Sequence, residues 1–107
     1  MICLYLEKNP AVKAKLIQEI DEVIPTEADI SSDNLKKLHY TQAVINETGR
    51  MYGPGTAIFS RHVVKDHAIK EVQVKTGTLV NVCFIPNNYN PTFYVNPHEF
   101  NPDRWLN

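Results

Sequence analysis

Glu47-Thr48-Gly49-Arg50 and Phe100-Asn101-Pro102-Asp103-Arg104-Trp105 are the two stretches that decide the fold of this chain. Residues three apart on a helix share one face, so Glu47 and Arg50 can pair. Arg104 follows Arg50 by 54 residues (104 − 50) and is a candidate second cation for the same carboxylate. On most helices a Glu–Arg pair at this spacing is a solvated surface pair, so the surrounding residues must decide whether this pair is exposed or buried.

The neighbours of Glu47 place its carboxylate on an apolar stripe. Four residues at helical spacing form this stripe: Tyr40, Ala43, Val44 and Met51. Glu47 is therefore expected to face inward, where an unpaired carboxylate would cost roughly 3–5 kcal/mol. Arg50 can supply part of the pairing, and its five-donor fork leaves further N–H groups for backbone carbonyls. These residues predict a buried ionic network.

The composition is that of an ordinary globular protein. The chain has 107 residues, 43% hydrophobic and 21% charged, with a formal net charge of −1. A chain with this net charge lacks the excess of basic residues that is typical of nucleic-acid-binding domains. No apolar run approaches the roughly 18 residues of a membrane span. We therefore expect no nucleic-acid partner and no membrane segment in this chain.

The cysteines and histidines do not suggest a metal site. Cys3 and Cys83 lie far apart without CxxC spacing, and we expect both to be reduced, buried, small apolar residues. The histidines are scattered without ligand spacing: His39, His62, His67 and His98. The prediction for metal ligands in this chain is none.

The first half of the chain has helical periodicity. A helix is expected to begin at Asn9-Pro10, with Asn9 as N-cap, and to end before Pro25. A polar connector (26–33) follows, and Ser32 or Asp33 can cap a short helical turn. The second main helix is expected from about Tyr40 to Met51.

The second half changes to a strand-like pattern. Residues 57–64 suggest a strand interrupted by Arg61 and His62, short β-rich pieces follow at 68–69 and 72–74, and Lys75-Thr76-Gly77 is a turn. The strongest strand prediction is 78–85, which is rich in β-branched and aromatic residues. From Pro86 onward, the density of proline and asparagine predicts a meander without regular elements.

The expected fold class is α+β. Two main helices (1–52) precede a small, mostly antiparallel sheet (53–85) and an irregular meander (86–107), which together form one partial domain. Large apolar residues at both ends, including Met1–Leu6 and Trp105, lack neighbours in sequence to cover them. We therefore expect the chain to be a middle part of a larger protein.

These residues, taken in order, resemble the cytochrome P-450 family of haem-thiolate monooxygenases. The resemblance covers essentially the whole chain, from Lys8-Asn9-Pro10 through Glu47–Arg50 and the strand ending in Arg61 to the Phe100–Trp105 motif. A Glu-x-x-Arg motif alone is weak, but the ordered set at these spacings is specific. The resemblance implies a mainly α fold of which this chain is an incomplete part.

The resemblance also implies roles for individual residues. Glu47, Arg50 and Arg104 match the family's buried Glu-Arg-Arg network. Arg61 matches an arginine that binds a haem propionate, and Asn88 stands where many members carry a histidine near the other propionate, so that its cofactor contact is a weak expectation. The matching substrate-lining residues are Ala57, Ile58 and Phe59.

The largest departure from the family pattern concerns the iron ligand. In the family this is a cysteine in a glycine-rich loop beyond the Phe100–Trp105 motif, and neither Cys3, which is expected to precede a helix, nor Cys83 has that context. The resemblance implies an intact parent that binds haem iron, takes electrons from a reductase or other donor, and oxidises a small organic substrate. We expect the isolated chain to be inactive, to contain no catalytic residue and to bind haem weakly or not at all.

Two other expectations complete the sequence-based account. The resemblance places the parent at the endoplasmic reticulum membrane, with its anchor absent here and the fragment itself otherwise cytoplasmic. The alternative to an oxidoreductase fragment is a small α+β interaction domain without catalytic activity, or the product of a degenerate gene.

Overall fold

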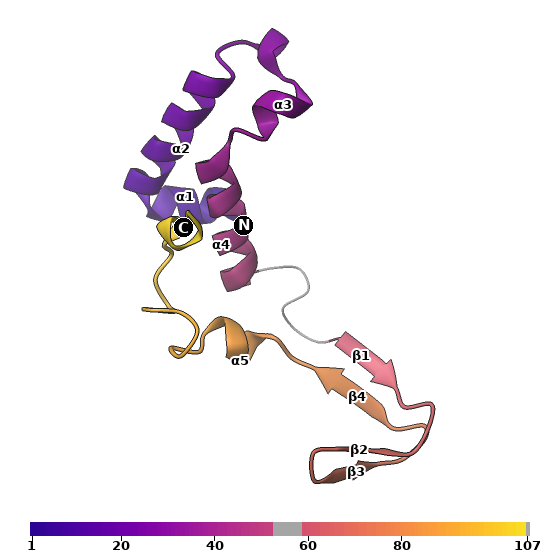
Figure 1. The fold of residues 1–107 in the computed structure, drawn as a ribbon. Helices are drawn as coiled ribbons and strands as arrows, with labels where there is room; N and C mark the ends of the chain where they lie inside the picture. The colour runs from indigo at the N-terminus through magenta and orange to yellow at the C-terminus, as the bar shows by residue number, and fades with distance from the viewer. Residues whose placement is uncertain (53–58, 107) are drawn as a thin grey trace.

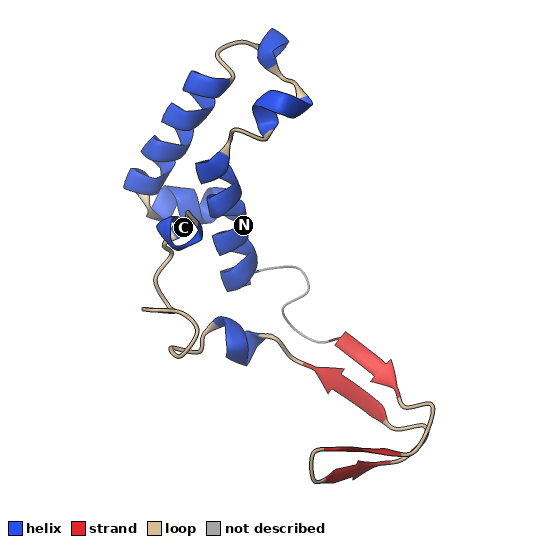
Figure 2. Ribbon diagram, viewed as in Figure 1, coloured by secondary structure: helices blue, strands red, loops and turns tan. Residues whose placement is uncertain are grey.

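The chain is described here from a computed structural model that covers residues 1–52 and 59–106. A helical body and a β-hairpin arm lie at opposite ends of the molecule (Figure 1). The order of elements is helices, then paired strands, then a largely irregular segment that returns to the helices (Figure 2). The expected α+β class is confirmed.

The helical body contains three longer helices, α1 (Ile2–Lys8), α2 (Pro10–Val23) and α4 (His39–Tyr52). Pro10 occupies the first turn of α2, where its missing N–H is not needed. Asn9 does not cap α2 through its side chain; its Nδ2 instead donates to the Tyr5 carbonyl at 2.8 Å. Helix α2 ends at Val23, before Pro25, as predicted.

Helix α1 was not predicted, and it corrects the expectation for Cys3. This cysteine lies within the helix and is exposed. Tyr5 of α1 explains why the short helix is held, because its ring stacks on Phe100 with centroids 4.7 Å apart. Tertiary packing thus stabilises a helix too short to form by itself.

Two short turns connect α2 to α4. The predicted connector contains η1 (Glu27–Asp29), closed by a capping box between Thr26 and Asp29. The predicted helical turn is α3 (Ser32–Leu35), and its N-cap is Ser31, one residue before the expected Ser32. The Ser31 hydroxyl accepts from the Asn34 N–H at 3.2 Å.

The core lies where α1, α2 and α4 meet the returning chain. Its buried hydrophobic residues come from distant parts of the sequence: Leu16, Tyr40, Val44 and Phe100. Val44 is fully buried, as the stripe around Glu47 predicts. Phe100 brings the last segment of the chain into contact with the helices.

The arm consists of two antiparallel pairs. β1 (Phe59–His62) pairs with β4 (Leu79–Val82), and β2 (His67–Ile69) pairs with β3 (Val72–Val74). Gly77 has a φ of +85°, which suits the predicted turn before β4. The prediction of one strand over 78–85 is wrong at its end, because Ile85 already belongs to a helix.

The returning segment is more regular than predicted. It contains α5 (Ile85–Asn88) and the 3₁₀ helix η2 (Pro102–Trp105). Each has proline in its first turn, where a missing N–H costs little. The high proline content therefore begins short helical turns as well as preventing long ones.

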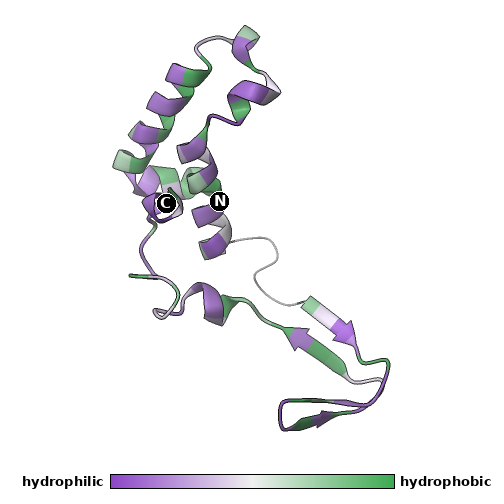
Figure 3. Cartoon of the chain, viewed as in Figure 1, coloured by the Kyte–Doolittle hydropathy of each residue, from purple (hydrophilic) through white to green (hydrophobic). Residues whose placement is uncertain are grey.

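The molecule is elongated. Its radius of gyration is 19.2 Å and its principal extents are 57 × 31 × 25 Å, whereas a compact chain of this length has a radius near 13 Å. Hydrophobic residues colour the first part of β4 and the segment that leads from it to α5 (Figure 3), and Leu79 and Val82 of β4 are exposed. Among the described helices, none combines the length and apolarity needed to cross a membrane.

Candidate structural site at Glu47

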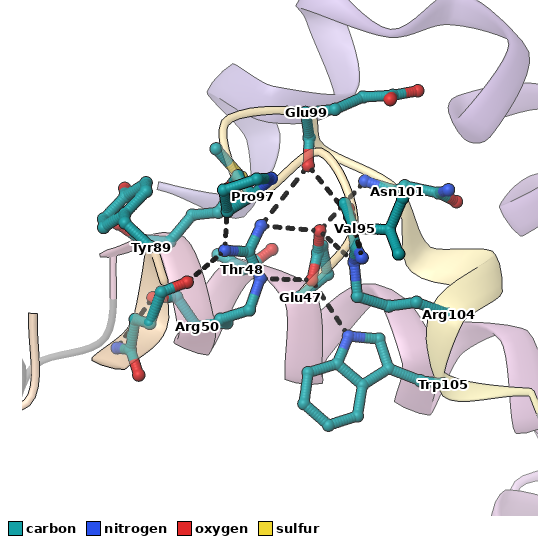
Figure 4. Close-up of polar contacts among 12 residues, drawn as sticks. Glu47, Thr48, Arg50, Tyr89, Val95, Pro97, Glu99, Asn101, Arg104 and Trp105 are labelled. Carbon is teal, nitrogen blue, oxygen red and sulfur yellow. Dashed lines mark hydrogen bonds and ion pairs between the residues drawn. The ribbon is translucent and has the colours of Figure 1, made fainter. Parts of the chain in front are cut away.

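The carboxylate of Glu47 is the centre of the site (Figure 4), and it is fully buried. Its Oε2 accepts from Nε of Arg50 at 2.8 Å and from Nε1 of Trp105 at 3.0 Å. Its Oε1 accepts from Nη2 of Arg50 at 2.9 Å, the backbone N–H of Asn101 at 3.0 Å and Nε of Arg104 at 3.1 Å. The carboxylate thus joins α4 to residues 101–105.

Arg50 carries the connection further through its remaining donors. Nη1 donates to the carbonyls of Asn88 at 2.6 Å and Pro97 at 2.8 Å, and Nη2 reaches the Glu99 carbonyl at 3.3 Å. One guanidinium therefore pairs with Glu47 in a bidentate manner and also binds three carbonyls of the returning segment. Lysine has no comparable planar fork.

Arg104 forms the outer part of the network. Besides Glu47, its guanidinium contacts the carbonyls of Val95 at 3.0 Å and Glu99 at 3.5 Å. Its side chain is 13% exposed, against 1% for Arg50. The structure therefore brings Glu47, Arg50 and Arg104 together around one carboxylate.

Aromatic rings border the two cations. The Arg50 guanidinium lies 5.0 Å from the Tyr94 ring centre and 5.8 Å from that of Tyr89. Arg104 lies 6.0 Å from the Tyr94 ring centre on the meander side. These are cation–π distances, so the rings add to the stabilisation of both cations.

The C-terminal end of α4 is capped by residues near α5. Asn88 Nδ2 donates to the Arg50 carbonyl at 2.9 Å, and the Tyr89 hydroxyl donates to the Met51 carbonyl at 2.8 Å. The last carbonyls of a helix lack intrahelical partners, so these bonds satisfy acceptors that would otherwise need water. Asn88, expected near a propionate, uses its side-chain donor within the fold.

The charges of the site stabilise each other. Burial alone would raise the pKa of Glu47, but hydrogen bonds from Arg50, the Asn101 N–H and Trp105 outweigh it and hold that pKa below its ordinary value. The hydrogen bond to Glu47 raises the pKa of Arg50. No buried side-chain nitrogen or oxygen within the described ranges lacks a partner. The arrangement is suited to holding structure, because the charged groups of Glu47, Arg50 and Arg104 are all engaged in these internal contacts.

Arg61 lies on β1 in the arm, eleven residues after Arg50 (61 − 50), and its side chain is exposed. Its Nη1 donates to the Ser60 carbonyl at 2.9 Å, and its guanidinium lies 5.9 Å from the Phe59 ring centre. It borders an open hollow of about 450 Å³ together with His62, Lys65 and His67. Of the predicted substrate-lining residues, Phe59 begins β1, whereas Ala57 and Ile58 lie outside the described residues.

The cysteine expectation needs correction. Cys3 and Cys83 are both unbonded, but both are exposed rather than buried, because α1 turns Cys3 outward and Cys83 follows the end of β4. In the part of the chain that the structure describes, no three side chains of histidine, cysteine, aspartate or glutamate gather into a metal-binding group.

Sequence reasoning missed two donors to Glu47, Trp105 and the Asn101 N–H. The sequence contained a signal for Trp105: its indole has one donor and no acceptor, and it follows Arg104 in the same motif. A backbone N–H carries no such signal, because its direction depends on the fold of the meander. Asn101 places it by capping η2: its Oδ1 accepts from the Asp103 N–H at 3.1 Å.

Comparison with known proteins gives the family. A sequence profile described as Cytochrome P450 matches residues 1–107. "Cytochrome P450 3A18" of Rattus norvegicus is 36% identical over 94% of the chain, and "Cytochrome P450 71B22" of Arabidopsis thaliana is 30% identical over 94%. "Cytochrome P450 monooxygenase ORF9" of Penicillium roqueforti is 36% identical over 96%. The chain spans 20% of the length of each of these relatives, and it belongs to the cytochrome P450 family.

Proposed function

We propose that this chain is the part of a haem-thiolate monooxygenase that fixes the meander onto helix α4. The observation that supports this is the Glu47 carboxylate, whose partners come from α4, from Asn101 and from the η2 turn. Within the described ranges, the polar contacts of Glu47 are all made with other residues of the chain, which supports a structural rather than a catalytic role. The complete protein inserts one oxygen atom of O₂ into a small organic substrate, using electrons from a reductase or other donor at the endoplasmic reticulum membrane.

The family implies a haem cofactor. Among the described residues, Arg61 is suited to bind one of its propionates. An exposed guanidinium beside a hollow is a suitable donor for a propionate, and such a charge-assisted bond contributes roughly 1.5–3 kcal/mol. Asn88 fits less well, because its amide nitrogen is bonded to the Arg50 carbonyl. Bound haem supplies the iron at which O₂ is activated.

The cysteines of this chain do not fit the axial position. Cys3 lies in α1 and Cys83 directly follows β4, and neither belongs to a glycine-rich loop. We therefore assign the thiolate ligand to a residue outside this sequence. The isolated 107-residue chain is expected to show no thiolate-type absorption band when it is mixed with haem, reduced and treated with carbon monoxide.

The test of the haem assignment uses the full-length protein that carries this segment. Arg61→Ala should lower the haem content per protein while leaving the far-ultraviolet circular dichroism unchanged. Lys65→Ala is the matched control, since it removes an exposed cation from the rim of the same hollow. Equal haem retention in Arg61→Ala and Lys65→Ala would contradict the role of Arg61.

The test of the scaffold role uses Glu47→Ala in the same protein. This change leaves Arg50 buried without its carboxylate, so haem incorporation should fail because the meander is no longer held. A well-folded Glu47→Ala protein with full haem content would contradict the structural role.

A further inference from the structure

Glu19 of α2 makes a second set of inter-helix contacts, at the opposite end of α4 from the Glu47 network. Its Oε1 accepts from the Tyr40 N–H at 2.6 Å, and its Oε2 accepts from the Thr41 N–H at 2.7 Å and from the Thr41 hydroxyl at 2.8 Å. The three bonds bridge 21 and 22 residues of sequence. Both carboxylate oxygens are thus used on a neighbouring helix.

These contacts replace a missing local cap. The first N–H groups of a helix have no intrahelical acceptor, and a side chain at the N-cap usually supplies one at the second or third helical position. Helix α4 begins at His39, so Tyr40 and Thr41 are those positions. Leu38 precedes the helix and has no side-chain acceptor, so the cap comes from α2.

The hydrogen bonds to Glu19 favour its ionised form. Burial alone would raise the pKa of Glu19, but the hydrogen bonds from Tyr40 and Thr41 outweigh it, and the neighbouring His39 lowers that pKa by a smaller amount. On the same helix as Glu19, the Lys15 ammonium lies 5.5 Å from the Tyr40 ring centre and pairs with Asp103 of η2 at 3.3 Å.

We propose that Glu19 is a positioning residue, which holds the first turns of α4 against α2 and thereby fixes where α4 presents Glu47 and Arg50. Thr41 precedes Glu47 by six residues (47 − 41), or about 9 Å along the helix axis. A shift of the first turn is therefore transmitted to the network through a short, continuous helix. This inference concerns packing within the chain and does not depend on haem.

The variant pair that tests it is Glu19→Gln and Glu22→Gln. Both remove one carboxylate from α2, but the Glu22 carboxylate is exposed and pairs with Gln18 of its own helix. Amide hydrogen exchange of the complete, ¹⁵N-labelled chain near neutral pH provides the local measurement. Glu19→Gln should speed exchange at Thr41 by roughly five- to thirtyfold, whereas Glu22→Gln should leave it unchanged.

The readout that distinguishes positioning from local capping is the indole N–H of Trp105, which contacts Glu47 rather than Glu19. Its signal should change as acid breaks the Glu47 contacts, and the midpoint of that change should move to higher pH in Glu19→Gln but not in Glu22→Gln. Glu19→Asp, which keeps the charge on a shorter side chain, should fall between wild type and Glu19→Gln.

Two results would overturn the inference. One is equal exchange at Thr41 in the Glu19→Gln and Glu22→Gln variants, and the other is a Trp105 midpoint that is the same in both. If Glu19→Gln does not fold, Glu19→Asp replaces it in both measurements, and the same two comparisons with Glu22→Gln decide the inference.

Discussion

The indole nitrogen of Trp105 donates to Oε2 of Glu47 over 3.0 Å, across 58 residues of sequence. This bond joins the η2 turn near the end of the described chain to the middle of α4. Closing such a long loop costs entropy, so one hydrogen bond would not hold it. The neighbouring bonds from Asn101 and Arg104 to the same carboxylate, together with the burial of Phe100, supply the rest of the free energy that offsets this cost.

Replacing Glu47 by glutamine should destabilise the chain strongly. The amide keeps the size of the side chain but cannot neutralise Arg50, and one of its ends is a donor facing other donors. We expect a loss of about 3–5 kcal/mol in the free energy of unfolding, measured by urea denaturation followed by circular dichroism. Glu22→Gln, which changes an exposed carboxylate, should cost less than about 0.5 kcal/mol. Similar losses in both variants would count against a buried network.

Arg50→Lys should be much more damaging than Arg104→Lys. Lysine keeps the charge but loses the fork with which Arg50 binds both oxygens of Glu47 and the carbonyls of the meander. Arg104 makes one bond to Glu47 and is more exposed. Urea midpoints of the two variants give the comparison, and a larger drop for Arg104→Lys would reverse the order of importance proposed here.

The stability of the chain should fall in acid. Since the folded pKa values of Glu47 and Glu19 are both lowered, these groups stabilise the fold fully above their unfolded pKa values, near 4.3. That stabilisation is lost as the pH falls from there through the folded values. Thermal unfolding followed from pH 7 to pH 3 should show a declining midpoint in this lower range. A midpoint of thermal unfolding that rises as the pH falls below 4.5 would contradict this prediction.

Asp66 gives an independent acid titration in the arm. Hydrogen bonds from Lys75 Nζ, the Thr76 N–H and the Thr76 hydroxyl lower its pKa to about 2. The contacts should therefore persist while the pH falls below the ordinary aspartate value and break only near pH 2. The carboxyl carbon shift of Asp66 measures this directly. A midpoint near 3.9, the unperturbed value, would show that the turn at Lys75–Gly77 does not engage Asp66 in solution.

Local pattern was enough to predict α2, α4 and the positions of the strands of the arm, but not their limits: Arg61 and His62, expected to interrupt the first strand, lie within β1. The stripe around Glu47 indicated burial because helical spacing fixes which residues share a face. Pro10 and Pro25 marked the limits of α2 because proline acts through its own backbone. These features are determined by residues close together in the sequence, so the sequence alone is enough to predict them.

The features that were missed depend on contacts between residues far apart in the sequence. Helix α1 is held by the stacking of Tyr5 on Phe100, and the cap of α4 comes from Glu19 of α2. The strand predicted through Ile85 ends at Val82 because Pro86 lies in the first turn of α5. β-propensity could not show this competition, since Phe84 and Ile85 suit either state.

The indole N–H of Trp105 gives the most direct test of the central claim, because the chain contains one tryptophan. In a ¹⁵N-labelled sample of the complete chain, we expect a single indole signal that exchanges slowly with water. That signal should shift in acid together with the carboxyl carbon of Glu47. An indole proton that exchanges at the rate of free tryptophan, with no shift as Glu47 titrates, would show that η2 is not bound to α4 and would contradict the account.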